Sequence, residues 1–94
     1  MLTLDEARAA FDRYAAREPL LVEGTLYVKE WYEDDSDFLP VWGAREFYVD
    51  DDHSYARWDQ RVVFIDKQTG EVRVELMPDH LAKTGAMTRV SAEA

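Results

Sequence analysis

The chain has 94 residues, a formal net charge of −9 and no cysteine. This indicates one small domain and excludes disulfides, a thiol nucleophile and a thiolate zinc site. The N-terminus lacks the basic start and apolar run of a secretory signal, and no apolar stretch reaches the length of a membrane span, so we expect a cytoplasmic protein with no membrane partner. Residues 30–59 hold ten acidic residues and two arginines, a net charge of −8. Because such a surface repels phosphates, we expect no nucleic acid partner.

Residues 3–17 predict a helix. Thr3 and Glu6 have the spacing of a capping box, in which each side chain satisfies a backbone amide at the start of the helix. Leu4, Ala7 and Phe11 recur at helical spacing and predict one apolar stripe that packs on a sheet. Pro19 ends the helix.

The rest of the chain predicts four strands, one loop, one acidic turn and a short helix. We expect the strands at 20–32, 41–49, 55–66 and 71–76, the loop at 33–40, the turn at 50–54 and the helix at 78–84. Residues 86–94 are expected to be a mobile tail. The order predicts a single α+β domain: an N-terminal helix packed on a curled antiparallel sheet of about four strands, and a short C-terminal helix.

Alternation along the first strand predicts which of its side chains are buried. Val22, Leu26 and Val28 share one face and are expected in the core, while Tyr27 and Trp31 are expected on the opposite, uncovered face. Elsewhere we expect Phe47 and Trp58 in the core.

The segment WYEDDSDFLPVW, residues 31–42, places four acidic residues between two tryptophans. Nine of the twelve aromatic residues fall between 27 and 58, so the acidic third of the chain is also its aromatic third. Aromatic rings dominate interface hot spots, and complementary charge steers association. This favours a non-enzymatic domain that binds a basic protein. The predicted contact residues are Trp31, Glu33, Asp34, Asp35, Asp37, Phe38, Trp42, Asp50, Asp51 and Asp52.

The other readings of these residues are a metal site, a small-ligand pocket and a small hydrolase. Asp34 to Asp37 offer oxygen ligands but lack the spacing of a calcium loop, so we expect no metal or other cofactor. His53 and His80 each follow an aspartate, yet no nucleophile motif accompanies them, and we expect no catalytic residue. A homodimer through the uncovered sheet face is compatible with each reading.

Two segments resemble the YrhB-like domains counted among bacterial immunity proteins. One is the opening helix with Leu4, Ala7 and Phe11; the other is the hairpin VVFIDKQTGEV with Asp66, Thr69 and Gly70. The resemblance covers the first fifth of the chain and residues 61–76. It implies a cytoplasmic antidote that binds and blocks a toxin without catalysis, and it transfers no site residue to this sequence.

Overall fold

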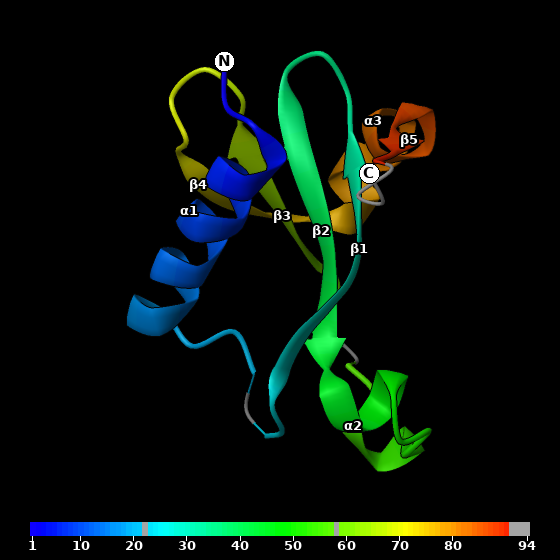
Figure 1. Cartoon of the computed structure of the whole chain (residues 1–94). Coiled ribbons are helices and arrows are strands. Elements are labelled where there is room, and N and C mark those ends of the chain that lie inside the picture. The colour runs from blue at the N-terminus through cyan, green and yellow to red at the C-terminus, as the bar shows by residue number, and fades with distance from the viewer. Residues whose placement is uncertain (22, 58, 91–94) are drawn as a thin grey trace.

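The computed structural model describes residues 1–21, 23–57 and 59–90. A curled antiparallel sheet has the strand order β4-β3-β2-β1-β5, with a helix at each end of the chain (Figure 1). This confirms the predicted α+β class, with five strands rather than four. The helices are α1 (Leu4–Arg17), α2 (Arg45–Tyr48) and α3 (Leu81–Ala86), and the strands are β1 (Leu26–Glu33), β2 (Asp37–Ala44), β3 (Arg61–Asp66), β4 (Val72–Leu76) and β5 (Thr88–Arg89). Short 3₁₀ helices, η1 (His53–Tyr55) and η2 (Met77–His80), precede β3 and α3.

Helix α1 begins with the predicted capping box. The Thr3 amide donates to the Glu6 carboxylate at 2.8 Å, and the Glu6 amide donates to the Thr3 hydroxyl at 3.2 Å. The stripe then buries Ala7, Ala10 and Phe11 against the sheet. The predicted hairpin is also present, and Gly70 adopts a left-handed φ of 76° there, which glycine accommodates without steric cost.

The turn between β1 and β2 is shorter than the predicted loop. The Asp34 carboxylate accepts hydrogen bonds from the backbone amides of Ser36 and Asp37 at 2.9 and 2.8 Å, so the chain reverses within a few residues and β2 begins at Asp37.

The expected strand at 41–49 is wrong in its second half, because α2 begins at Arg45. The expected strand at 55–66 is correct only from Arg61 onward.

A β-bulge explains why the predicted faces of β1 are wrong. Val28 lies opposite Trp42 and Glu30 lies opposite Val41, so Lys29 is an extra residue in β1. One extra residue reverses the alternation beyond it. Trp31 therefore shares the core face with Leu26 and Val28 instead of lying opposite them.

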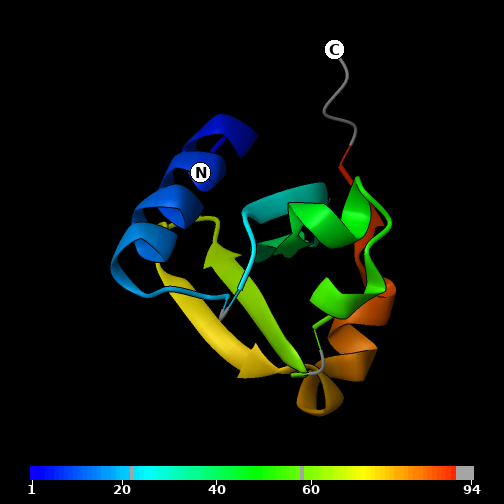
Figure 2. The same ribbon diagram turned by 90° about the horizontal axis from the view of Figure 1, so that it is seen from below.

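Both faces of the sheet carry buried clusters. One cluster lies under α1 and includes Phe11, Trp31 and Trp42; the other includes Leu39, Phe64 and Met87. Figure 2 shows α1 on one side of the sheet and the C-terminal segment (orange) on the other. The face expected to be uncovered is therefore covered.

The predicted mobile tail is wrong for residues 86–90, because these residues are parts of the fold. Met87 is buried, Thr88 and Arg89 form β5 beside β1, and the Val90 amide donates to the Trp31 carbonyl at 2.8 Å. The remainder of the predicted tail, residues 91–94, lies outside the described residues, as do Val22 and Trp58, for which we predicted core positions.

Candidate functional site

The three aromatic residues predicted to contact a partner lie in the core. Trp31 and Phe38 are 5% exposed and Trp42 is 1% exposed. Trp31 packs edge-on against both Phe11 of α1 and Phe38, with ring centroids 6.2 and 6.5 Å apart. The Arg57 guanidinium lies 3.6 Å from the Trp42 ring centroid. The expectation that these rings reach solvent is therefore wrong, and they stabilise the fold rather than form a surface.

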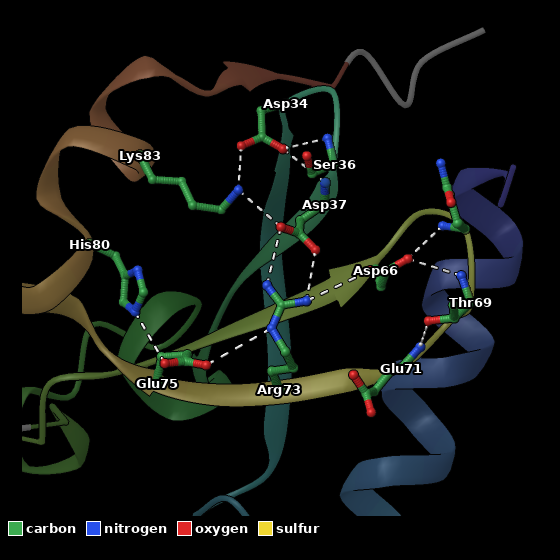
Figure 3. Close-up of polar contacts among 11 residues, drawn as sticks. Asp34, Ser36, Asp37, Asp66, Thr69, Glu71, Arg73, Glu75, His80 and Lys83 are labelled. Atoms are coloured by element: carbon green, nitrogen blue, oxygen red, sulfur yellow. Dashed lines mark hydrogen bonds and ion pairs between the residues drawn. The ribbon is translucent and has the colours of Figure 1, made fainter.

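Asp37 is also buried, with 2% of the residue exposed. Figure 3 shows its carboxylate between two cations. Each oxygen of Asp37 accepts a hydrogen bond from Arg73 of β4 at 3.2 Å, and Lys83 of α3 lies 2.9 Å from Oδ2. Lys83 also donates to Asp34 at 2.6 Å. This network joins the β1–β2 turn to both β4 and α3, and it leaves Asp37 no free face for a partner.

The protonation behaviour of the network follows from these contacts. The hydrogen bonds from Arg73 to Asp37 raise the pKa of the Arg73 guanidinium. Partial burial acts against the charged form of Lys83, but its bonds to Asp34 and Asp37 outweigh burial and raise the Lys83 pKa. Burial likewise opposes ionisation of Asp34, yet Lys83 and the two backbone amides lower its pKa. For Arg73, Lys83 and Asp34 the net pKa shift therefore favours the ionised form.

The remaining acidic residues of the β1–β2 region also meet cations, apart from Asp35. Glu33 accepts a hydrogen bond from Lys67 at 2.7 Å, and Glu30 lies 3.5 Å from Arg89. Asp35 is exposed. The charge that the sequence concentrates in residues 30–37 is thus largely neutralised within the fold, by side chains that all come from the C-terminal third of the chain.

The acidic turn at 50–52 has the opposite environment. Asp50, Asp51 and Asp52 are exposed, and in the described part of the chain none lies within ion-pair distance of a lysine or arginine. Asp52 accepts the Ser54 amide at 3.0 Å and the Ser54 hydroxyl at 2.6 Å, which caps η1 and lowers the Asp52 pKa. Asp51 adopts a left-handed φ of 57° and lies 3.5 Å from the exposed His53.

Partly exposed aromatic rings stand beside this turn. Phe47 and Tyr48 of α2 lie with ring centroids 5.2 Å apart, Tyr27 lies 6.0 Å from Tyr48, and Val49 is 48% exposed. A surface pocket runs between α2 and Tyr55. The predicted core position of Phe47 is therefore wrong, since its ring is only half-buried on α2. We call this surface the acidic corner; it consists of Glu46, Phe47, Tyr48, Val49, Asp50, Asp51, Asp52 and Tyr55.

The Glu46 carboxylate anchors the acidic corner to the start of β1. It accepts the Thr25 amide at 2.9 Å and the Thr25 hydroxyl at 3.1 Å, and the bond from the backbone amide is the main reason that its pKa is lowered. Residues 46–55 contain four carboxylates and no lysine or arginine. The predicted contact residues included Asp50 to Asp52 but not the rings of α2, because VWGAREFYV has the composition of a strand.

Each of the two histidines contacts a carboxylate and an aromatic ring. His80 lies 3.1 Å from the Glu75 carboxylate and packs edge-on against Phe64, with centroids 5.3 Å apart. His53 packs against Phe47 at 5.7 Å. Within residues 1–21, 23–57 and 59–90, no group of three or more histidine or carboxylate side chains is placed to hold a metal ion.

Comparisons with protein-family models, with curated proteins and with solved structures found no match to this chain. Among the described residues, no helix has both the length and the apolar character needed to cross a membrane.

Proposed function

We propose that this chain is a non-enzymatic protein-binding domain that docks the acidic corner on a basic surface of a partner protein. The observation that carries the proposal is the contrast in charge pairing. The carboxylates of residues 30–37 are largely paired with lysine and arginine of the same chain, whereas in the described part of the chain Asp50, Asp51 and Asp52 face solvent beside partly exposed rings with no lysine or arginine in ion-pair distance. Unpaired surface charge steers association, and adjacent rings supply area that a partner can bury.

The resemblance to YrhB-like immunity domains supports a bacterial toxin as the partner and the cytoplasm as the compartment. A toxin that binds nucleic acid presents a cationic surface. The four carboxylates of the acidic corner complement such a surface in charge. A cationic partner also brings arginine, which pairs with carboxylates and stacks on aromatic rings such as Phe47 and Tyr48. The earlier candidates Trp31, Phe38 and Trp42 contribute to this function only by stabilising the sheet that carries the acidic corner.

The test compares two variants with the same net charge. Asp50→Asn/Asp51→Asn/Asp52→Asn neutralises the acidic corner. Asp12→Asn/Asp35→Asn/Asp79→Asn neutralises three exposed aspartates elsewhere and is the matched control. Both variants and the wild-type chain serve as bait in an extract of the native cell, and association of each captured basic protein is then measured at several salt concentrations.

We expect the acidic-corner variant to associate at least about tenfold more slowly at low salt and to show a weaker salt dependence, because it loses the steering charge. The control variant should associate at nearly the wild-type rate. Equal rates for the two variants would contradict the proposed surface. Failure of the wild-type chain to retain any basic protein would contradict the proposed function itself.

A further inference from the structure

Strand β4 is an open edge of the sheet. It pairs with β3 over five residue pairs without a bulge, and it has no strand on its other side in the described part of the chain. The opposite edge is β5, which has only two residues. An edge strand exposes backbone donors and acceptors that can pair with another strand, and natural proteins usually interrupt such edges with proline, lysine or a bulge. Residues 72–76 contain no proline, lysine or bulge, and their two charged residues, Arg73 and Glu75, have opposite signs.

The hydrogen-bonding pattern shows which backbone groups of β4 point outward. The Asp66 amide donates to the Glu71 carbonyl at 2.9 Å, and the Met77 amide donates to the Gln60 carbonyl at 2.7 Å. Antiparallel ladders alternate between bonded and non-bonded pairs, so Arg73 and Glu75 also bond to β3. The amides and carbonyls of the other three residues therefore face the open edge; these are Val72, Val74 and Leu76.

The sequence of this edge is complementary to itself. When two copies of Val72–Leu76 run antiparallel about a two-fold axis at Val74, each Val72 lies opposite Leu76 of the second copy. Each Arg73 then lies opposite Glu75 of the second copy, so unlike charges meet twice on one face. The apolar pairs meet on the other face, where Leu76 is 55% exposed in the single chain.

We propose that two copies of this chain form a homodimer by antiparallel pairing of their β4 strands, with Val74 at the two-fold axis. This register makes Val74–Val74 and both Val72–Leu76 pairs hydrogen-bonded pairs, because the backbone groups of these residues face outward. Arg73 keeps its bonds to the buried Asp37 and gains a carboxylate across the interface. The sheets of the two copies then join into one.

The proposal is independent of the acidic corner. Helix α2 follows β2 and packs against β1 and β2, whereas β4 lies at the far edge of the sheet (Figure 1). Pairing through β4 leaves the acidic corner of each copy in solvent. Failure of either proposal therefore leaves the other standing.

Leu76→Pro tests the interface with little expected effect on the fold. Its amide has no partner on β3, the residue is 55% exposed, and its φ of −98° must shift by about 20° to enter the range of proline. Leu76→Ala is the matched control, since it keeps the amide and removes the side chain. The molecular mass of each variant is measured by sedimentation equilibrium over a range of concentrations, with circular dichroism as the check on folding.

We expect the wild-type chain to dimerise with rising concentration. Leu76→Pro removes two symmetry-related hydrogen bonds and should raise the dimer dissociation constant at least about tenfold, more than Leu76→Ala does. A wild-type chain that stays monomeric, or a Leu76→Pro chain that dimerises as the wild type does, overturns the proposal.

Amide hydrogen exchange of the wild-type chain gives a second readout that needs no variant. In the dimer the Val72, Val74 and Leu76 amides are bonded, so their exchange should slow as the protein concentration rises. Exchange of these three amides that is fast at every concentration overturns the proposal, including the case of a dimer formed through another surface.

Discussion

The two acidic segments of this chain, residues 30–37 and residues 50–52, are both rich in carboxylates but lie in different environments. In the first segment Glu33, Asp34 and Asp37 are ion-paired with lysine and arginine, and Asp37 is buried. In the second segment all three aspartates face solvent. The difference arises because every cation that neutralises the first segment comes from the C-terminal third of the chain, which folds back over it. Local charge density therefore does not predict surface potential.

The aromatic residues of the two regions differ in the same way. Trp31 and Trp42 fill the core between α1 and the sheet, whereas Phe47 and Tyr48 stand half-exposed on α2. Substitution of the first pair should affect folding, and substitution of the second pair should affect binding.

The largest effect that we expect is that of Trp42→Ala. Trp42 is 1% exposed, and its loss leaves a large cavity, so the free energy of unfolding should fall by about 3–5 kcal/mol. Phe47→Ala is the matched aromatic truncation in the acidic corner and should cost less than half as much. Urea denaturation measures both values. Equal losses would show that the two regions do not differ as described.

Asp37→Asn should lower the free energy of unfolding by about 3 kcal/mol. It removes the buried carboxylate that contacts both Arg73 and Lys83 while keeping the side-chain shape, and it leaves Arg73 with only the longer contacts to Asp66 and Glu75 among the described residues. Asp35→Asn, two residues earlier and exposed, should change stability by less than about 0.5 kcal/mol. A small effect of Asp37→Asn would indicate that the network contributes little to the fold.

A smaller effect is expected in the pH dependence of stability. The Asp34 pKa is lower in the folded chain than its ordinary value of 3.8, so ionised Asp34 stabilises the fold above that value. This contribution is lost as the pH falls below about 4 and through the folded-state pKa. Asp34→Asn should therefore reduce stability at neutral pH and flatten the loss of stability in acid. Chemical denaturation between neutral pH and about pH 2.5 measures the two slopes; identical slopes would contradict the pKa shift.

Local signals in the sequence were enough to predict part of the fold. The Thr3–Glu6 capping box, the apolar stripe with Phe11 and the hairpin at Gly70 each depend on neighbours within a few residues, and each is confirmed. The strand expected at 55–66 contains the run Val62 to Ile65, which is apolar on both faces, and all four of these residues are buried.

The environment of Trp31 and Asp37 could not be predicted in this way. The position of Trp31 depends on the bulge at Lys29, and no local sequence feature indicated an extra residue there. Asp37 is bonded to Arg73, 36 residues away, and Asp34 is bonded to Lys83, 49 residues away. Contacts at such separations follow from the topology of the sheet, which the sequence patterns did not determine.

The most direct test of the account is to measure the free energy of unfolding of two triple variants side by side. Asp34→Asn/Asp35→Asn/Asp37→Asn removes charges that are mostly paired inside the fold, and Asp50→Asn/Asp51→Asn/Asp52→Asn removes the same number of exposed charges. Asparagine still caps a helix at position 52 and tolerates the left-handed backbone of position 51. We predict a loss of about 3–5 kcal/mol for the first variant and a change below about 0.5 kcal/mol for the second. Similar losses in both variants, or a larger loss in the second, would contradict the division of this chain into an internally paired acidic segment and an exposed one.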